Sequence, residues 1–257
     1  MACSEKQPLV SVIMPAYNVA KYIEQAIRSV MSQTVIQWEL LVLDDCSTDK
    51  TCAIVQELAA ADARITLHKN EHNMGVAATR NHALGLCRGR YVAFLDSDDI
   101  WYPEKLEKQL ALMETTGAQL CYCAYAMIDR EGKQSHADYL VPAQISYDAL
   151  LEENVIGCST VMLSAAVAQK YRFATDYYHE DYVLWLQLLK DGVPAAGCTE
   201  VLAGWRHLDQ SRSANKLRSA YKRWVIYRKY LKLPLIRSVW LLCNYALAGL
   251  KKYRKSS

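Results

Sequence analysis

A short apolar segment that ends in three carboxylates constrains this chain more than any other feature. Residues 91–95 have the length and the β-branched and aromatic composition of a buried strand, and Asp96, Asp98 and Asp99 follow within four residues. Mostly parallel sheets bind their ligands at the carboxyl ends of such strands. We therefore expect a mainly parallel sheet with these acids in its ligand site.

The three acids allow two interpretations. Crowded carboxylates repel one another unless a cation or hydrogen-bond donors compensate, and Mg2+ or Mn2+ takes oxygen ligands of this kind, which suggests a metal-bound phosphate. Alternatively, Asp98 and Asp99 cap a helix that begins after them, with Pro103 in its first turn. The spacing alone favours neither interpretation.

Strand-like and helix-like segments alternate in the first part of the chain. Strand patterns at 9–14, 38–43, 65–68 and 91–95 are separated by helical patterns at about 19–33, 47–61 and 75–86. This alternation predicts a mostly parallel α/β sheet with helices on both faces. Polar clusters recur near successive strand ends, so we expect them at one edge of the sheet: Tyr17 and Asn18, Asp44 and Asp45, Arg80 and Asn81, and residues 96–99.

The second part of the chain is less regular. A helix to about residue 115 is followed by an alternating run at 119–128, which predicts an antiparallel strand. A later helix opens with Glu180 and Asp181, two acids that also suit the helix dipole. Neither a G-x-G-x-x-G motif after the first strand nor a phosphate-loop motif is present, which argues against dinucleotide and nucleoside-triphosphatase sites.

Length, cysteines and charge narrow the class of protein. The 257 residues fit one α/β domain, alone or with a small appendage, and nine cysteines without a C-x-x-C pair or signal peptide favour a reducing cytoplasm. No acid follows Asp209, whereas 13 Lys and Arg lie from Arg212 onward, which leaves 17 basic and 27 acidic residues before them. The basic tail therefore predicts an anionic partner. This partner is a membrane surface, a nucleic acid or the acidic remainder of the same chain.

The tail combines this charge with apolar residues at helical spacing. Residues 215–231 predict a basic amphipathic helix, and the apolar run at 235–250 is interrupted by Arg237 and Asn244. We expect the tail to lie in the interface of an anionic membrane, with packing on the preceding domain as the alternative. Nucleic acid is disfavoured because no recognised binding motif or aromatic stacking platform is present, and a homodimer through the tail is a further hypothesis.

Six ordered motifs resemble glycosyltransferase family 2 over residues 8–212. They are Pro15-Ala-Tyr-Asn18, Asp44-Asp45-x-Ser47-x-Asp49, Asn73-x-Gly75, Arg80-Asn81, Asp96-Ser-Asp98-Asp99 and Glu180-Asp181-x-x-x-Trp185. The resemblance implies a glycosyltransferase A (GT-A) fold, with a nucleotide-binding half at about 8–100, an acceptor half at about 101–212 and the tail at 213–257. It favours the metal interpretation of the acids after the fourth strand.

The resemblance also implies roles for individual donor-site residues. Asp45 would accept a hydrogen bond from the uracil imide and Tyr17 would stack near the base, so uridine is the expected nucleoside. Arg80 would face the diphosphate or the ribose, with a paired surface arginine as the alternative. The implied nucleotide-sugar residues are Pro15, Tyr17, Asn18, Asp45, Arg80, Asp96, Ser97, Asp98 and Asp99.

The implied chemistry is an inverting, metal-dependent sugar transfer. Asp96 and Asp98 would hold Mn2+ or Mg2+, and Asp99 would turn toward the donor sugar or cap a helix. His207 would be a further metal ligand, as in some relatives, or a histidine that is simply hydrogen-bonded. Asp181, preceded by Glu180, matches the catalytic base of a single displacement. Trp185 would form an apolar surface at the bottom of the acceptor site, or it would belong to the hydrophobic core.

The resulting hypothesis is a bacterial hexosyltransferase at the cytoplasmic face of the inner membrane. It would move a hexose or N-acetylhexosamine from a UDP-sugar to a saccharide on undecaprenyl diphosphate, for O-antigen, capsule or teichuronic acid. The alternatives are a sugar nucleotidyltransferase and a non-catalytic basic protein that binds membrane or nucleic acid.

Overall fold

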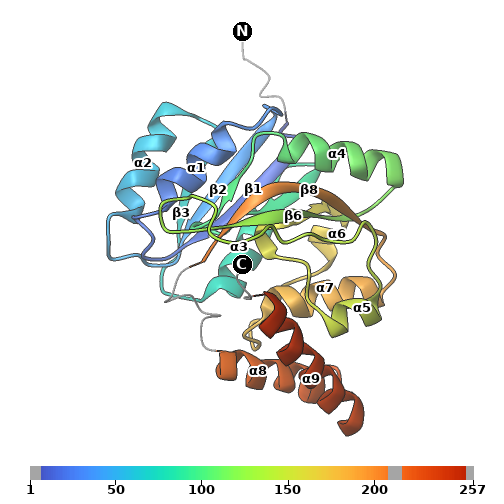
Figure 1. Ribbon diagram of the computed structural model, residues 1–257. Coiled ribbons are helices and arrows are strands. Elements are labelled where there is room, and N and C mark those ends of the chain that lie inside the picture. Colours follow the sequence, from blue (N-terminus) through green and yellow to red (C-terminus); the bar gives the residue numbers. More distant parts are fainter. Residues whose placement is uncertain (1–6, 208–215, 253–257) are drawn as a thin grey trace.

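The computed structural model describes residues 7–207 and 216–252, and an eight-stranded sheet lies at its centre (Figure 1). The strand order is β3-β2-β1-β4-β7-β6-β8-β5. β1 is parallel to β2 and β4, β2 to β3, and β6 to β8, whereas β7 is antiparallel to both neighbours and β5 to β8. The strands are β1 (Val10–Ala16), β2 (Trp38–Asp44), β3 (Ile65–Lys69), β4 (Tyr91–Phe94), β5 (Ile100–Trp101), β6 (Leu120–Ile128), β7 (Met162–Ser164) and β8 (Ala195–Arg206).

Helices cover both faces of the sheet. The first core cluster packs α1 (Ile23–Met31), α2 (Thr51–Ala61) and α4 (Lys105–Thr116) on one face. The second packs the opposite face against α3 (Val76–Leu84), α5 (Tyr147–Glu152), α6 (Ala165–Lys170) and α7 (Glu180–Lys190). Because both faces are covered, β1 and β2 are buried along their whole length, as their continuous apolar runs predict.

The tail forms a helical unit that packs on the second cluster. It contains α8 (Lys216–Val225), a π-helical turn (Ile226–Tyr230) and α9 (Leu235–Lys252), which lie beside α5 and α7 in Figure 1. Tyr227 and Leu241 are buried, so the predicted alternative of packing on the domain is present. Within the described parts of the chain, no helix has both the length and the apolar character to cross a bilayer.

Of two expectations about the middle of the chain, the antiparallel strand holds only in part and the helix cap is wrong. β6 is parallel to β8 over nine residues and antiparallel to β7 at only two positions. Every residue of β6 is buried, so the alternation in its sequence does not correspond to one buried and one exposed side of the strand. Residues 98 and 99 do not cap a helix either, because β5 follows them and α4 begins only at Lys105, with Glu104 at its N-cap and Pro103 before that.

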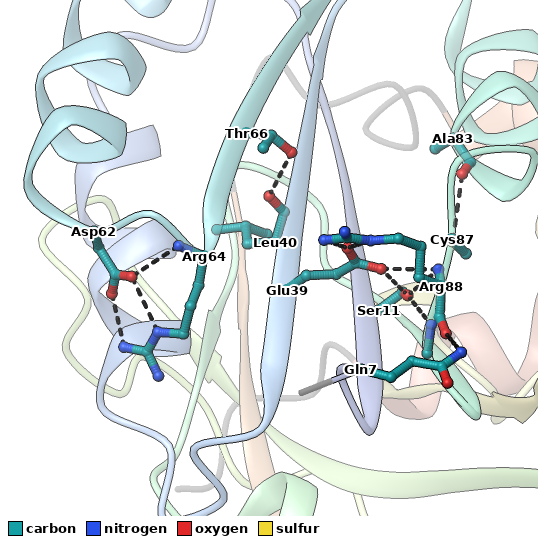
Figure 2. Close-up of polar contacts among 11 residues, drawn as sticks. Gln7, Ser11, Glu39, Leu40, Asp62, Arg64, Thr66, Ala83, Cys87 and Arg88 are labelled. Carbon is teal, nitrogen blue, oxygen red and sulfur yellow. Dashed lines mark hydrogen bonds and ion pairs between the residues drawn. The ribbon is translucent and has the colours of Figure 1, made fainter. Parts of the chain in front are cut away.

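A buried polar network ties the amino ends of three strands together, opposite the ends that carry the acids (Figure 2). Glu39 Oε1 accepts from Ser11 Oγ at 2.6 Å and from the Arg88 amide at 2.9 Å, and the Arg88 guanidinium donates to Glu39 Oε2 at 2.8 Å. Ser11 Oγ in turn accepts from the Gly89 amide. The network fixes where β4 enters the sheet beside β1.

Replacing Glu39 tests this network. Glu39→Ala leaves the buried Ser11 hydroxyl without its acceptor and removes the carboxylate that the Arg88 amide and guanidinium bind, so we expect the free energy of unfolding to fall by about 2–4 kcal/mol. Urea unfolding followed by circular dichroism measures the change. Glu24→Ala is the matched control, because Glu24 pairs with Arg28 on the exposed surface and should contribute under about 0.5 kcal/mol. Equal losses in the two variants would contradict the assignment.

Candidate active site

A cavity of about 840 Å³ opens at the carboxyl ends of β1, β2 and β4. This is the edge at which the strand alternation predicts a site. The predicted residues that line the cavity are Pro15, Tyr17, Asn18, Asp45, Arg80, Asp96, Ser97, Asp98, Glu180 and Asp181. The fold therefore brings motifs from both parts of the chain to one place.

The loops after β1 and β2 hold each other in place. Asn18 adopts a positive φ of 49°, and its Oδ1 accepts from the amides of Thr48 at 2.8 Å and Asp49 at 3.3 Å. The Asn18 amide donates to Ser47 Oγ at 2.9 Å. Tyr17 precedes these hydrogen bonds in the chain. It is 52% exposed in the cavity lining, where its ring is accessible to a ligand.

Asp45 anchors the segment that leads into α3. Its Oδ1 accepts from the Met74 amide at 2.8 Å and from Asn70 Nδ2 at 2.9 Å, and its Oδ2 accepts from the Gly75 amide at 2.8 Å. Gly75 has a φ of +80°, which glycine adopts without strain. A carboxylate offers about four lone-pair sites, so Asp45 orders the loop and has one site left. Its bond to uracil stays a prediction.

Arg80 joins the two acidic motifs. It is 3% exposed, and its guanidinium donates to Asp96 Oδ1 at 2.5 Å and to Glu180 Oε1 at 2.8 Å. The Phe173 ring lies 5.3 Å from the guanidinium carbon. The alternative of a surface arginine is therefore wrong. Arg80 links the end of β4 to the start of α7, and its approach to a diphosphate or ribose stays a prediction.

The cavity concentrates negative charge. Burial and the neighbouring Asp96 raise the pKa of Asp98 to about 6, with Arg206 and Arg80 opposing the shift. Burial and Glu180 likewise raise the pKa of Asp181 to about 6. Both shifts mean that the ionised carboxylates lack full compensation, which is the condition a divalent cation would relieve.

The acids after β4 fit such a cation as a partial ligand set. Asp96 and Asp98 both line the cavity. Among the described side chains, no group of three or more His, Cys, Asp and Glu residues is arranged to hold a metal ion. Mg2+ in phosphate-transfer sites is typically bound by one or two carboxylates and completed by phosphate oxygens and water. The donor set here suits that arrangement.

Asp99 does not have either of its expected roles. It is buried outside the cavity lining, and it accepts hydrogen bonds from Ser159 Oγ at 2.5 Å and from the Arg206 amide at 2.8 Å. Burial, followed by the charges of Asp98 and Asp96, raises its pKa well above the usual value. Asp99 thus ties the acidic loop to the end of β8, and it neither faces a donor sugar nor caps a helix.

Arg206 is a site residue that the sequence motifs missed. It is 1% exposed and lines the cavity. Its Nε donates to the Asp98 carbonyl at 2.6 Å, Nη1 to the carbonyls of Asp129 and Arg130 at 2.7 and 2.8 Å, and Nη2 to Gln25 Oε1 at 2.6 Å. Three distant segments therefore meet on one guanidinium. Most of its partners are backbone carbonyls, which leave no signal in a sequence.

Two further expectations do not match the geometry. His207 is absent from the cavity lining, and its ring lies edge-on to His136 at 5.9 Å, so the structure gives no support to its role as a metal ligand. Trp185 is fully buried and packs against Phe94 and Phe173 at centroid distances of 6.2 and 6.0 Å. Trp185 belongs to the core, as its alternative interpretation states, and does not floor an acceptor site.

Known proteins similar to this chain are glycosyltransferases. The putative teichuronic acid biosynthesis glycosyltransferase TuaG of Bacillus subtilis is 39% identical over 246 residues, which is 96% of this chain and 98% of TuaG. The UDP-Glc:alpha-D-GlcNAc-diphosphoundecaprenol beta-1,3-glucosyltransferase WfgD of Escherichia coli is also 39% identical over 246 residues, 95% of each protein.

Solved structures share the fold. Staphylococcus aureus TarS 1–349 in complex with UDP-GlcNAc has a TM-score of 0.71 at 20% identity, over 92% of this chain and 71% of that one. The mannosyltransferase PcManGT of Pyrobaculum calidifontis, in complex with GDP-Man and Mn2+, has a TM-score of 0.71 at 19% identity, over 98% and 77%. The family model Glycosyl transferase family 2 matches residues 11–169. The chain therefore belongs to glycosyl transferase family 2 and has the GT-A fold.

Proposed function

We propose that this glycosyltransferase moves a hexose or N-acetylhexosamine from a UDP-sugar to a saccharide carried on undecaprenyl diphosphate, in the synthesis of a bacterial surface polysaccharide. The arrangement that supports this best is the meeting of Asp96, Asp98 and Asp181 in one cavity. The donor and acceptor classes are those of WfgD, a UDP-Glc:alpha-D-GlcNAc-diphosphoundecaprenol glucosyltransferase that is similar over nearly its whole length. The complexes of TarS with UDP-GlcNAc and of PcManGT with GDP-Man support a nucleotide-diphosphate sugar as donor in this fold.

The donor side of the cavity is suited to a nucleotide diphosphate. Tyr17 offers an exposed ring for a base, and the loops after β1 and β2 are already ordered by Asn18. Asp96 and Asp98 would hold Mn2+ or Mg2+, which when bound stabilises the charge that develops on the leaving diphosphate. Arg80 and Arg206 hold these acids and their loop in position.

Asp181 is the proposed base of the transfer. Glu180 is engaged by Arg80 at 2.8 Å, so Asp181 is the acid of this pair that is suited to accept a proton from the acceptor hydroxyl. With a pKa of about 6 it is ionised at neutral pH, yet more basic than an exposed aspartate. The hydroxyl oxygen attacks the anomeric carbon on the face opposite the diphosphate, and this single displacement inverts the anomeric centre.

Turnover of a panel of UDP-sugars tests the proposal. Purified protein, Mn2+ and a synthetic lipid-diphosphate GlcNAc acceptor should release UDP from one donor, and Asp98→Ala and Asp181→Asn should each lower the rate by about 10²–10⁴-fold. Calorimetry separates the role of proton acceptor from that of metal ligand. Asp181→Asn should still bind UDP-sugar in the presence of Mn2+, whereas Asp98→Ala should lose the part of the donor affinity that depends on Mn2+. The proposal fails if no nucleotide sugar binds or turns over.

The pH dependence of kcat/KM tests the base. The folded pKa of Asp181 is raised to about 6, so below that pH the carboxylate is protonated and cannot accept a proton. We expect kcat/KM to fall about tenfold per pH unit below about 6 and to reach a plateau above it. The profile is measured at saturating Mn2+, because carboxylates that bind the metal do not titrate there. It is then repeated at lower Mn2+ concentrations, and an apparent pKa that changes with the Mn2+ concentration would implicate Asp98 instead of Asp181.

Arg206→Lys tests the support of the acidic loop. Lysine keeps the charge, but one ammonium cannot reproduce the guanidinium fork, so the free energy of unfolding should fall by about 2–4 kcal/mol. The KM for donor should rise about tenfold while the pH profile keeps its shape, because the base is untouched. Steady-state kinetics and urea unfolding measure both. Arg28→Lys, at an exposed pair, is the control and should change neither.

A further inference from the structure

Helix α9 is apolar on two opposite faces. On the inner side Leu241 is buried in the second core cluster, and Ser238 is buried with its hydroxyl bonded to the Pro234 carbonyl. On the outer side Ile236 is 86% exposed, Val239 47% and Trp240 50%, and Cys243 is also exposed. The spacing 236, 239, 240, 243 places these four side chains on one helical face. A helix of this kind is normally covered on both sides, so the outer face indicates a second partner.

The π-helical turn before α9, and α9 itself through Arg237, contact the catalytic domain. The Tyr227 hydroxyl donates to the Leu151 carbonyl at 3.1 Å, and Arg237 pairs with Asp148 at 2.5 Å. The Tyr230 ring lies 5.2 Å from that of Tyr177, a residue of the cavity lining. Whatever binds the outer face of α9 is therefore held on the side of the cavity that carries Glu180 and Asp181.

The segment that leads into α9 is cationic. Arg228, Lys229 and Lys232 are exposed at the junction between α8 and α9. No acid follows Asp209 anywhere in the chain, and the acid that pairs with Arg237 of α9 is Asp148 of the domain. An exposed apolar and aromatic face preceded by exposed cations matches the interface of an anionic bilayer, in which acyl chains receive the apolar side chains and headgroup phosphates meet the cations.

A second copy of the chain fits this face less well. In a twofold dimer the same patch meets itself, so the cations of one tail would face the cations of the other. With no acids in the tail to compensate them, that contact would be repulsive. The charge pattern therefore selects lipid over self-association.

We propose that the outer face of α9 (Ile236, Val239, Trp240 and Cys243), flanked by Arg228, Lys229 and Lys232, docks the enzyme on an anionic phospholipid bilayer. The proposal rests on the proposed function, because a sugar acceptor on undecaprenyl diphosphate is held in a membrane. The helix lies in the interface without crossing it. Docking there brings the lipid surface to the side of the cavity that holds the proposed base.

Vesicle flotation with the full chain tests the docking face. Wild-type protein should bind phosphatidylcholine vesicles containing phosphatidylglycerol, and Ile236→Glu/Trp240→Glu should weaken this binding at least tenfold. Ile36→Glu is the matched control, since Ile36 is 66% exposed on the loop before β2 and should leave binding unchanged. Vesicle binding of the double variant equal to that of the wild type would overturn the proposal. The proposal would also be overturned if light scattering showed a dimeric wild type and a monomeric double variant that still binds lipid.

Two further measurements separate docking from catalysis and from misfolding. The double variant should turn over a short-chain, water-soluble acceptor at the wild-type rate but a vesicle-embedded acceptor at least tenfold more slowly. Loss with both acceptors would contradict a purely docking role, and no turnover by the wild type would refute the proposed function while flotation still tests the face. Brominated lipids should quench tryptophan fluorescence in the wild type, and this quenching should fall at least twofold in Trp240→Phe.

Discussion

The buried guanidinium of Arg80 is the interaction on which the site depends. Its two ends bind Asp96, which follows β4, and Glu180, which begins α7, so one side chain joins acids 84 positions apart in the chain. A buried charge that loses a partner costs about 3–5 kcal/mol, so the fold holds both acids close to the cation. The positions of the proposed metal-binding and proton-accepting groups are thereby coupled. Arg206 applies the same principle to the acidic loop, but through backbone carbonyls.

The layout of the nucleotide-binding half was predictable because local patterns determine it. Alternating strand and helix segments predicted a parallel arrangement, which holds for β1, β2, β3 and β4. The carboxyl edge then placed Pro15, Asp45 and Asp98 together in the cavity lining. The family resemblance added Asp181, which no local pattern could have brought to the same cavity. Here local sequence and tertiary structure agree, which is typical of foldable sequences.

What could not be predicted depends on contacts between distant segments. β6 pairs with β8, more than seventy positions later in the chain. Because β6 is buried on both faces, the alternation in its sequence does not indicate an antiparallel strand with one exposed side. Asp99 directly follows a cavity residue and Trp185 lies one helical turn after another, yet each points into the protein interior, toward Ser159 in one case and Phe94 in the other. A motif therefore identified the right segment without identifying which of its side chains reaches the cavity.

The tail shows that two interpretations of a sequence need not exclude each other. Packing on the domain and binding to a membrane were opposed alternatives for the apolar run after Pro234, because a helix with one apolar face can satisfy only one of them. α9 has two such faces. Leu241 is buried on the domain while Ile236 is exposed, so packing of the inner face leaves the outer face at the surface. The interruption at Arg237 is consistent with this, since that residue pairs with Asp148 at the border between the two faces.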